Sequence, residues 1–159
     1  MKSMIVSVVL FALCNNPAFG QSSPGRSHGQ FLYLPIYSHV WHGEVDRSGQ
    51  PTKTLVSISV SIRNTDPAKS IRISSAQYYD TDGKRLKEYV TSPKIIVPMG
   101  TYEIFVPRSD DTGGSGANFL ISWKSDTPVS PPIVEGFHAN IPLGRSIAFT
   151  TWARPIPVD

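Results

Sequence analysis

In the stretch from residue 55 to residue 63, apolar and polar side chains alternate strictly from Val56 onward, and this alternation constrains the fold more than any other feature. Successive side chains of a β-strand point to opposite faces, so the pattern predicts a strand with one face in a hydrophobic core. Turn residues at 64–67 end this strand, because proline cannot donate to a β-ladder and Asn and Asp favour turns. The inward face would carry Val56, Ile58, Val60 and Ile62, with three serines and Arg63 facing outward.

Similar short apolar runs, separated by turn residues, continue along the chain. They lie at 71–79, 85–90, 94–97, 101–106, 118–124, 133–139 and 146–153. Asp82 and Gly83 separate two of these runs, and such a pair is a strong hairpin signal. The 14 prolines and 12 glycines disfavour long helices. We therefore predict an all-β protein, an antiparallel β-sandwich of immunoglobulin-like type with seven or eight strands, and keep a barrel as the alternative.

The run at residues 32–41 predicts a strand with one aromatic face. Proline weakens a central ladder, so Pro35 places this strand at a sheet edge or on a bulge. Exposed aromatic side chains can stack on a sugar ring or anchor a protein, so we expect a protein or carbohydrate partner here if the face is open. The alternative is that another part of the fold covers it. The candidate binding residues are Tyr33, Tyr37, His39 and Trp41.

The first residues of the chain have the pattern of a secretory signal. Lys2 precedes an apolar run at 5–13, and Ala18 and Gly20 provide the small residues that a signal peptidase reads. The run is too short for a stable membrane anchor, which needs about 20 apolar residues. We therefore expect a signal peptide at 1–20, a flexible lead-in at 21–30 and a single β-sandwich domain at 31–159. The mature protein would be secreted or periplasmic and would have no transmembrane segment.

Cys14 is the only cysteine, and it lies inside the expected signal peptide. The mature protein would then contain no thiol, so the sequence predicts no disulfide and no cysteine nucleophile. The alternative is a lipoprotein in which Cys14 becomes the first residue. Leu13 argues against this alternative, because a small residue is expected at that position.

The composition excludes several classes of protein. Charged residues make up 17% of the chain and hydrophobic ones 40%, a balance that favours a packed core over disorder. With 15 basic and 12 acidic residues the net charge is +3, too small and too dispersed for a nucleic-acid-binding protein. We expect no nucleic-acid partner and no cofactor.

A glycine-rich segment at 113–117 contains Ser115 and suggests a hydrolase as an alternative function. Such an enzyme would pair Ser115 with His138 and with Asp110 or Asp111. A nucleophile elbow, however, needs a helix after the serine, and residues 118–123 have the pattern of a strand. A loop between two strands is therefore the favoured interpretation, and whether the protein is an enzyme stays open, with a non-catalytic role favoured.

Two acidic turns suggest calcium as a second alternative. Carboxylates in loops can bind Ca²⁺, which needs six to eight oxygen ligands. The segment that starts at Asp80 begins like a calcium-binding loop. Its twelfth residue, however, is Thr91, where such a loop needs a bidentate Glu. A calcium-stabilised adhesion-type module would need both turns to meet in space, whereas aspartates that simply close β-turns would not. The candidate ligands are Asp80, Asp82, Asp110 and Asp111.

Four short stretches carry a resemblance to a known family. They are residues 37–39 (Tyr-Ser-His), 61–66 (Ser-Ile-Arg-Asn-Thr-Asp), 78–83 (Tyr-Tyr-Asp-Thr-Asp-Gly) and 113–119 (Gly-Gly-Ser-Gly-Ala-Asn-Phe). In this order they resemble a bacterial family of small exported proteins classed only as a domain of unknown function, over residues 31–153. The resemblance implies export and one domain, and it implies no activity and no site residue. The sequence thus favours a non-catalytic binding or structural module of the cell envelope.

Overall fold

The computed structural model describes residues 25–157. The expected signal peptide, its cleavage site and Cys14 lie outside these residues. The described chain is all-β, which confirms the predicted class, and it contains no helix that could cross a membrane. The strands are β1 (Ser27–Pro35), β2 (His39–Val45), β3 (Pro51–Leu55), β4 (Ser57–Arg63), β5 (Ile71–Tyr79), β6 (Arg85–Glu88), β7 (Lys94–Ile96), β8 (Thr101–Val106), β9 (Asn118–Val129), β10 (Ile133–Asn140), β11 (Ile147–Trp152) and β12 (Arg154–Ile156).

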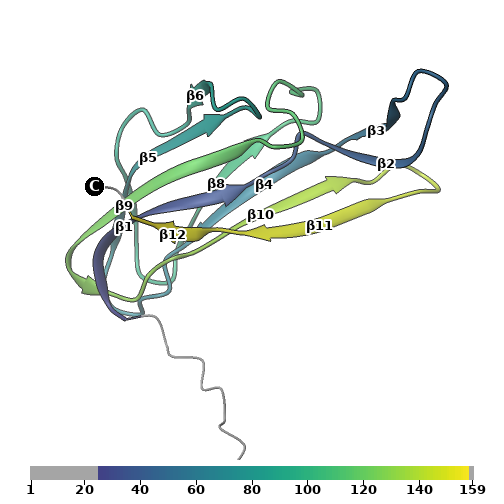
Figure 1. The fold of residues 1–159 in the computed structure, drawn as a ribbon. Helices are drawn as coiled ribbons and strands as arrows, with labels where there is room; N and C mark the ends of the chain where they lie inside the picture. Colours follow the sequence, from purple (N-terminus) through teal and green to yellow (C-terminus); the bar gives the residue numbers. More distant parts are fainter. Residues whose placement is uncertain (1–24, 158–159) are drawn as a thin grey trace, which may run out of the picture.

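The strands form two main sheets and a separate hairpin (Figure 1). The six-stranded sheet has the order β12-β1-β9-β5-β6, with β7 paired to β5. The four-stranded sheet has the order β11-β10-β4-β8, and β2 pairs only with β3. All of these pairings are antiparallel. The arrangement is that of a β-sandwich, as predicted.

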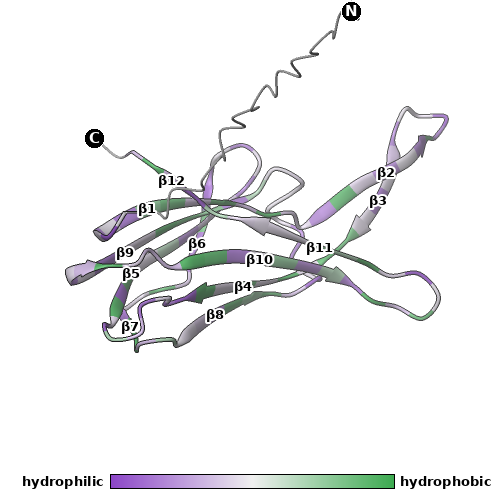
Figure 2. Cartoon of the chain, turned by 90° about the horizontal axis from the view of Figure 1, so that it is seen from below, coloured by the Kyte–Doolittle hydropathy of each residue, from purple (hydrophilic) through white to green (hydrophobic). Residues whose placement is uncertain are grey.

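The core lies between the two main sheets. The apolar face of β4 is fully buried, and the alternation that predicted this strand is visible along the ribbon in Figure 2. The six-stranded sheet contributes Leu34, Phe119 and Ile121, all with no exposed surface. Burying these side chains stabilises the fold by about 25 cal/mol for each Å² of apolar surface removed from water.

The expected seven or eight strands are wrong in number, because the run at 32–41 is divided and because β3 and β12 lie almost entirely outside the predicted runs. The run at 32–41 leaves the six-stranded sheet after Pro35 and resumes as β2 in the hairpin. Val56 separates β3 from β4, and its amide donates to the Ser38 carbonyl at 3.0 Å. Ala153 separates β11 from β12. In each case the chain changes its partner strand within one to three residues, and the sequence pattern does not show this change.

The crossing at Ala153 joins the two main sheets along one side of the sandwich. β11 pairs with β10 in the four-stranded sheet, and β12 pairs with β1 in the six-stranded sheet. The Ala153 amide donates to the Val134 carbonyl at 3.0 Å, which fixes the crossing point on β10. Side chains just before and just after Ala153 therefore belong to different sheets.

A polar network around Asn64 ties together three connections between the sheets. The buried Asn64 side-chain amide donates to the Lys69 carbonyl at 2.8 Å and to the Ile96 and Val97 carbonyls at 3.2 and 3.0 Å. Its Oδ1 accepts the Asp66 amide at 3.0 Å. The β4–β5 loop is thereby fixed to the turn between β7 and β8.

Asp66 extends this network to the third connection and to the start of β1. Its Oδ1 accepts the Ala68 and Lys69 amides, and its Oδ2 accepts the Ser130 amide at 3.3 Å and the Arg26 guanidinium at 3.0 Å. The hydrogen bond from the Ala68 amide is the main cause that lowers the pKa of Asp66. The carboxylate is therefore held in its charged form among donors.

We predict that Asn64→Ala lowers the free energy of unfolding by about 3 kcal/mol or more, because it leaves several buried backbone groups without partners. Urea denaturation followed by circular dichroism measures this change. Asn118→Ala is the matched control, since the described chain gives the Asn118 side chain no hydrogen bond, and we expect a loss of about 1 kcal/mol or less. Equal losses in the two variants would contradict a special role for Asn64.

Candidate functional site

The structure distributes the four predicted aromatic-face residues over different environments. Tyr33 lies on the outer face of the six-stranded sheet and is 39% exposed. Strand β12 pairs with β1 only as far as Tyr33, so Pro35 has β9 on one side and no strand on the other. The expectation that Pro35 places this strand at a sheet edge or on a bulge is therefore wrong for the strand, since β1 lies between β12 and β9, and only its end at Pro35 lacks a partner on one side. Beyond it the chain turns away, so the aromatic residues do not form one continuous face.

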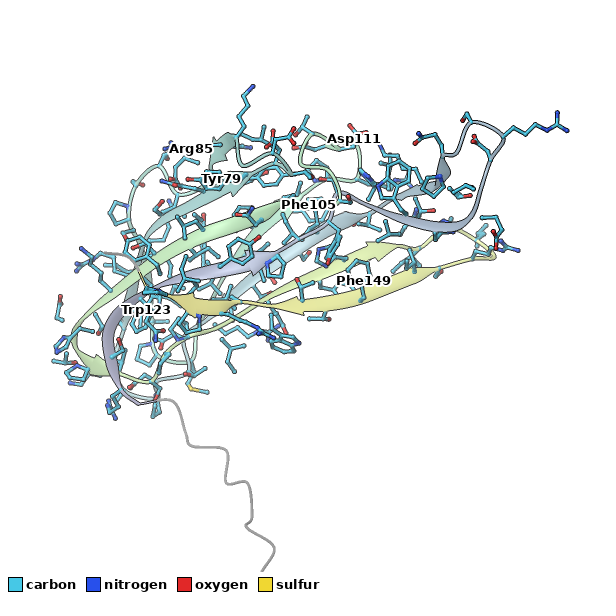
Figure 3. The ribbon with its side chains drawn as sticks, viewed as in Figure 1. Tyr79, Arg85, Phe105, Asp111, Trp123 and Phe149 are labelled. Atoms are coloured by element: carbon cyan, nitrogen blue, oxygen red, sulfur yellow. The ribbon has the colours of Figure 1, made fainter. Side chains whose placement is uncertain are left out.

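Tyr37 packs inward instead of facing solvent. Its ring meets the edges of His138 and Phe149, with ring centroids 5.7 and 5.6 Å apart. His138 is fully buried and stacks on Phe149 at 4.4 Å, the residue labelled on β11 in Figure 3. The Tyr37 amide donates to His138 Nε2 at 3.1 Å, so the neutral ring carries its proton on Nδ1. This cluster is part of the packing and does not form an open site.

His39 and Trp41 lie at the base of the β2–β3 hairpin, with ring centroids 4.8 Å apart. His39 is 6% exposed, and burial is the main cause that lowers its pKa, with the Lys53 ammonium adding to the effect. Trp41 is 46% exposed. Of the four candidate binding residues, Tyr33 and Trp41 are thus accessible, and they lie on separate strands, β1 and β2.

The two acidic turns do meet in space, through Thr81. Its amide donates to the Gly113 carbonyl at 2.9 Å, and its hydroxyl accepts the Gly116 amide at 3.0 Å. The aspartates nevertheless do not converge on one point. Within residues 25–157, no group of three or more His, Cys, Asp or Glu side chains could hold a metal ion.

Three of these four carboxylates have their own partners instead. Asp80 Oδ1 accepts the Asp82 and Lys84 amides at 3.0 and 2.8 Å, which closes the β5–β6 turn. Asp110 accepts the Thr112 hydroxyl at 2.6 Å in the next loop. Asp111, labelled in Figure 3, pairs with Lys53 at 2.9 Å, and that hydrogen bond lowers its pKa. The interpretation that aspartates close the turns accounts for Asp80 and Asp110, and the calcium hypothesis gains no support.

Ser115 has no catalytic partners in the described chain. Strand β9 follows the glycine-rich loop, where a nucleophile elbow would require a helix. His138 is inaccessible and its Nε2 already accepts the Tyr37 amide, while Asp110 and Asp111 are bonded elsewhere. Gly113 is tightly packed, since an added Cβ would lie 2.0 Å from the Tyr78 hydroxyl oxygen. The loop is therefore a structural connection.

An open cavity of about 410 Å³ lies where β11 crosses to β12, next to the end of β1. We call it the edge cavity, and it is lined by Tyr33, Pro35, Thr151, Trp152 and Arg154. Trp152 ends β11 and Arg154 begins β12, so the crossing at Ala153 brings side chains of both sheets to one place. Volumes of about 300–1,000 Å³ are typical of small-ligand pockets.

The two aromatic rings of the edge cavity are available for contacts. Trp152 is 57% exposed, and neither it nor Tyr33 packs against another aromatic ring of the described chain. Arg154 lies directly opposite Tyr33 in the β1–β12 register and forms no ion pair within residues 25–157. The cavity thus combines two apolar ring surfaces with a cationic hydrogen-bond donor.

Sequence reasoning identified Tyr33 but missed Trp152 and Arg154. Both residues lie in or just after the predicted strand at 146–153, where nothing in the alternation marks a change of sheet. The only sequence signal for these two residues is a tryptophan followed two residues later by an arginine. This signal points to a site only once the pairing of β12 with β1 is known.

Comparison with known proteins gives the family. A family model described as a protein of unknown function (DUF3124) matches residues 29–156. The chain belongs to this family. The resemblance seen in the four short stretches is thereby confirmed.

No curated protein matches the DUF3124 chain. Among solved structures it is similar to "Crystal Structure of Thermotoga maritima 1070", with 13% sequence identity over 79% of this chain and 92% of that chain. The TM-score of that similarity is 0.42.

We predict that His138 makes stability pH-dependent. Burial is the main cause that lowers its pKa from 6.5 to about 4. Between these values the unfolded chain binds a proton that the folded chain does not, so stability is fully present above pH 6.5 and falls as the pH drops toward 4. The expected loss from this residue is about 2.5 kcal/mol between pH 7.5 and 4.5.

Urea denaturation across this pH range, for the protein and for His138→Gln, isolates the contribution of His138 from that of the other titrating groups. We expect the stability difference between the two proteins to shrink as the pH falls. An NMR titration of the His138 ring gives a second readout, with a midpoint near pH 4. A midpoint near 6.5 would contradict the prediction.

Proposed function

We propose that this DUF3124 protein is a non-catalytic binding module that holds a saccharide in the edge cavity. The observation that carries the proposal is the pair of exposed rings, Tyr33 and Trp152, that line one cavity together with Arg154. The cavity is small and concave, which fits a small polar ligand better than a flat protein interface.

The chemistry of the cavity suits a sugar ring. Tyrosine and tryptophan offer a large apolar surface together with a polar tip, and a pyranose has apolar C–H faces and hydroxyl edges. The Arg154 guanidinium can donate several hydrogen bonds to hydroxyl oxygens. The hydroxyl of Thr151 donates weakly to the Gly136 carbonyl at 3.4 Å, so it can turn toward a ligand.

We further propose that the module acts after export, in the periplasm or outside the cell. Lys2, the apolar run at 5–13 and the Ala18-Phe19-Gly20 ending support this part of the proposal. The sequence has no cysteine after residue 14, so the exported protein would contain no thiol that an oxidising compartment could oxidise.

We predict that a neutral oligosaccharide probe, chitotriose or maltotriose, shifts the NMR signals of the Trp152 indole and the Tyr33 amide on titration. Trp152→Ser should weaken binding about thirtyfold, which corresponds to about 2 kcal/mol for the loss of an aromatic anchor. The side chain is mostly exposed, so thermal stability should change little.

Trp41→Ser is the matched control. It removes the same type of side chain at similar exposure from the β2–β3 hairpin, outside the edge cavity. We expect unchanged binding. Equal weakening by both substitutions, or no response of Trp152 to either probe, would contradict the saccharide proposal.

For export, we predict that the mature protein begins at Gln21. Intact mass of protein recovered from the periplasm or medium of an expressing bacterium measures the cleavage point directly. A mass that still includes residue 1 would contradict cleavage and export. A mass that begins at Cys14 and includes a lipid would instead support the lipoprotein alternative.

A further inference from the structure

Two cations face each other on the outer side of the six-stranded sheet. Arg72 on β5 lies directly opposite Lys124 on β9 in the antiparallel register, and both side chains are exposed. Like charges directly opposite on neighbouring strands destabilise a sheet. The pair is therefore a feature that folding alone disfavours.

No carboxylate of the described chain neutralises this pair. The ion pairs within residues 25–157 join Arg26 to Asp66, Lys53 to Asp111 and Arg63 to Glu135. Asp126 lies in the same region, but its carboxylate is not within 4 Å of either cation, so both charges remain available to a ligand.

The two cations line a cavity of about 470 Å³. We call it the cationic cavity. Its other walls include His28, Phe31, Ser122 and Trp123, the last labelled in Figure 3. A smaller hollow of about 220 Å³ lies beside it and shares Arg72 and Lys124. The guanidinium can therefore be approached from two sides.

The backbone beneath the cationic cavity is fixed by close packing. Gly29 on β1 lies opposite Lys124, and an added Cβ there would lie 2.5 Å from the Trp123 carbonyl oxygen. The neighbouring His28 ring lies 3.4 Å from the Ser125 carbonyl oxygen through Nδ1. This contact with a carbonyl oxygen places the His28 ring at the rim of the cationic cavity.

We propose that the cationic cavity binds a tetrahedral oxyanion, a phosphate or sulfate group. The planar Arg72 guanidinium can hold two oxygens of such a group at once, while Lys124 supplies a mobile point charge. The Ser122 hydroxyl lies at the same cavity, accepts from the Ser74 hydroxyl at 2.9 Å, and can donate its own proton to a remaining oxygen. The anion would also remove the repulsion between the two cations, which accounts for their unpaired juxtaposition.

The site is separate from the edge cavity and does not depend on the proposed saccharide function. The two cavities share no lining residue. The two cavities are neighbours along β1, since Phe31 lines one and Tyr33 lines the other, two residues apart. A single anionic chain could reach both, and a free anion would occupy only the cationic cavity.

Isothermal titration with inorganic phosphate, dextran sulfate and uncharged dextran tests the proposal on residues 21–159. We expect the two anionic probes to bind and dextran not to bind at the cationic cavity, with NMR shifts at Arg72 and Lys124. The double variant Arg72→Gln/Lys124→Gln should weaken anion binding at least tenfold. Tighter binding of dextran sulfate than of phosphate would indicate that the natural ligand is an anionic polymer. Tighter binding of phosphate would indicate that it is a free ion.

The matched control is Lys84→Gln/Arg85→Gln, which removes the same charge from the β5–β6 hairpin of the same sheet. Both side chains are exposed, and Arg85 lies well away from Trp123 in Figure 3. We expect less than a twofold change in binding. Equal weakening in both double variants would show diffuse attraction to a basic surface and would overturn the site.

Thermal melting at low salt gives an independent readout. Arg72→Gln should raise the melting temperature without anion, because it relieves the repulsion, and should abolish the further rise that phosphate gives the unsubstituted protein. A lower melting temperature would show that Arg72 has a structural role. That result, or anion binding that survives the Arg72→Gln/Lys124→Gln substitution, would overturn the proposal.

Discussion

The hydrogen bonds of Asn64 and Asp66 are the constraint on which the rest of this sandwich depends. They join the β4–β5 loop, the β7–β8 turn and the start of the β9–β10 loop, which are all passages from one main sheet to the other. Hydrophobic contact between the sheets is non-directional, whereas these bonds fix one relative position. The segment at 64–66 that helps to mark the family therefore has a structural role, which explains why it points to no activity.

The side chains that remain accessible support the proposed binding function. The groups that a hydrolase or a calcium site would need are already in use, since the aspartates close turns or pair with Lys53 and His138 is buried. The accessible groups are aromatic rings at the edge cavity and unpaired cations at the cationic cavity. Rings and fixed cations recognise ligands without moving protons or electrons, so both cavities favour binding.

The sequence predicted the strands well where each strand stays within one sheet. The limits of β5 and β8 agree with the alternating runs at 71–79 and 101–106, and the Asp-Gly pair does mark the β5–β6 hairpin, with Gly83 at a φ of 79°. It failed at 32–41 and at the end of the run at 146–153, where the chain passes from one sheet to another. Alternation reports which side chains are buried, and both sheets bury their inner faces in the same core.

The sequence by itself determined the all-β class, the core face of β4 and the turns, because these follow from local periodicity and turn chemistry. It also indicated the family, through the resemblance carried by four short stretches. It also supplied Tyr33 as a candidate. Only the tertiary structure placed Trp152 and Arg154 beside Tyr33, and Arg72 opposite Lys124. Those residues are between 52 and 121 positions apart in the chain (124 − 72 and 154 − 33), and strand pairing alone brings them together. Register is set by how the whole core packs, so no local pattern could contain it.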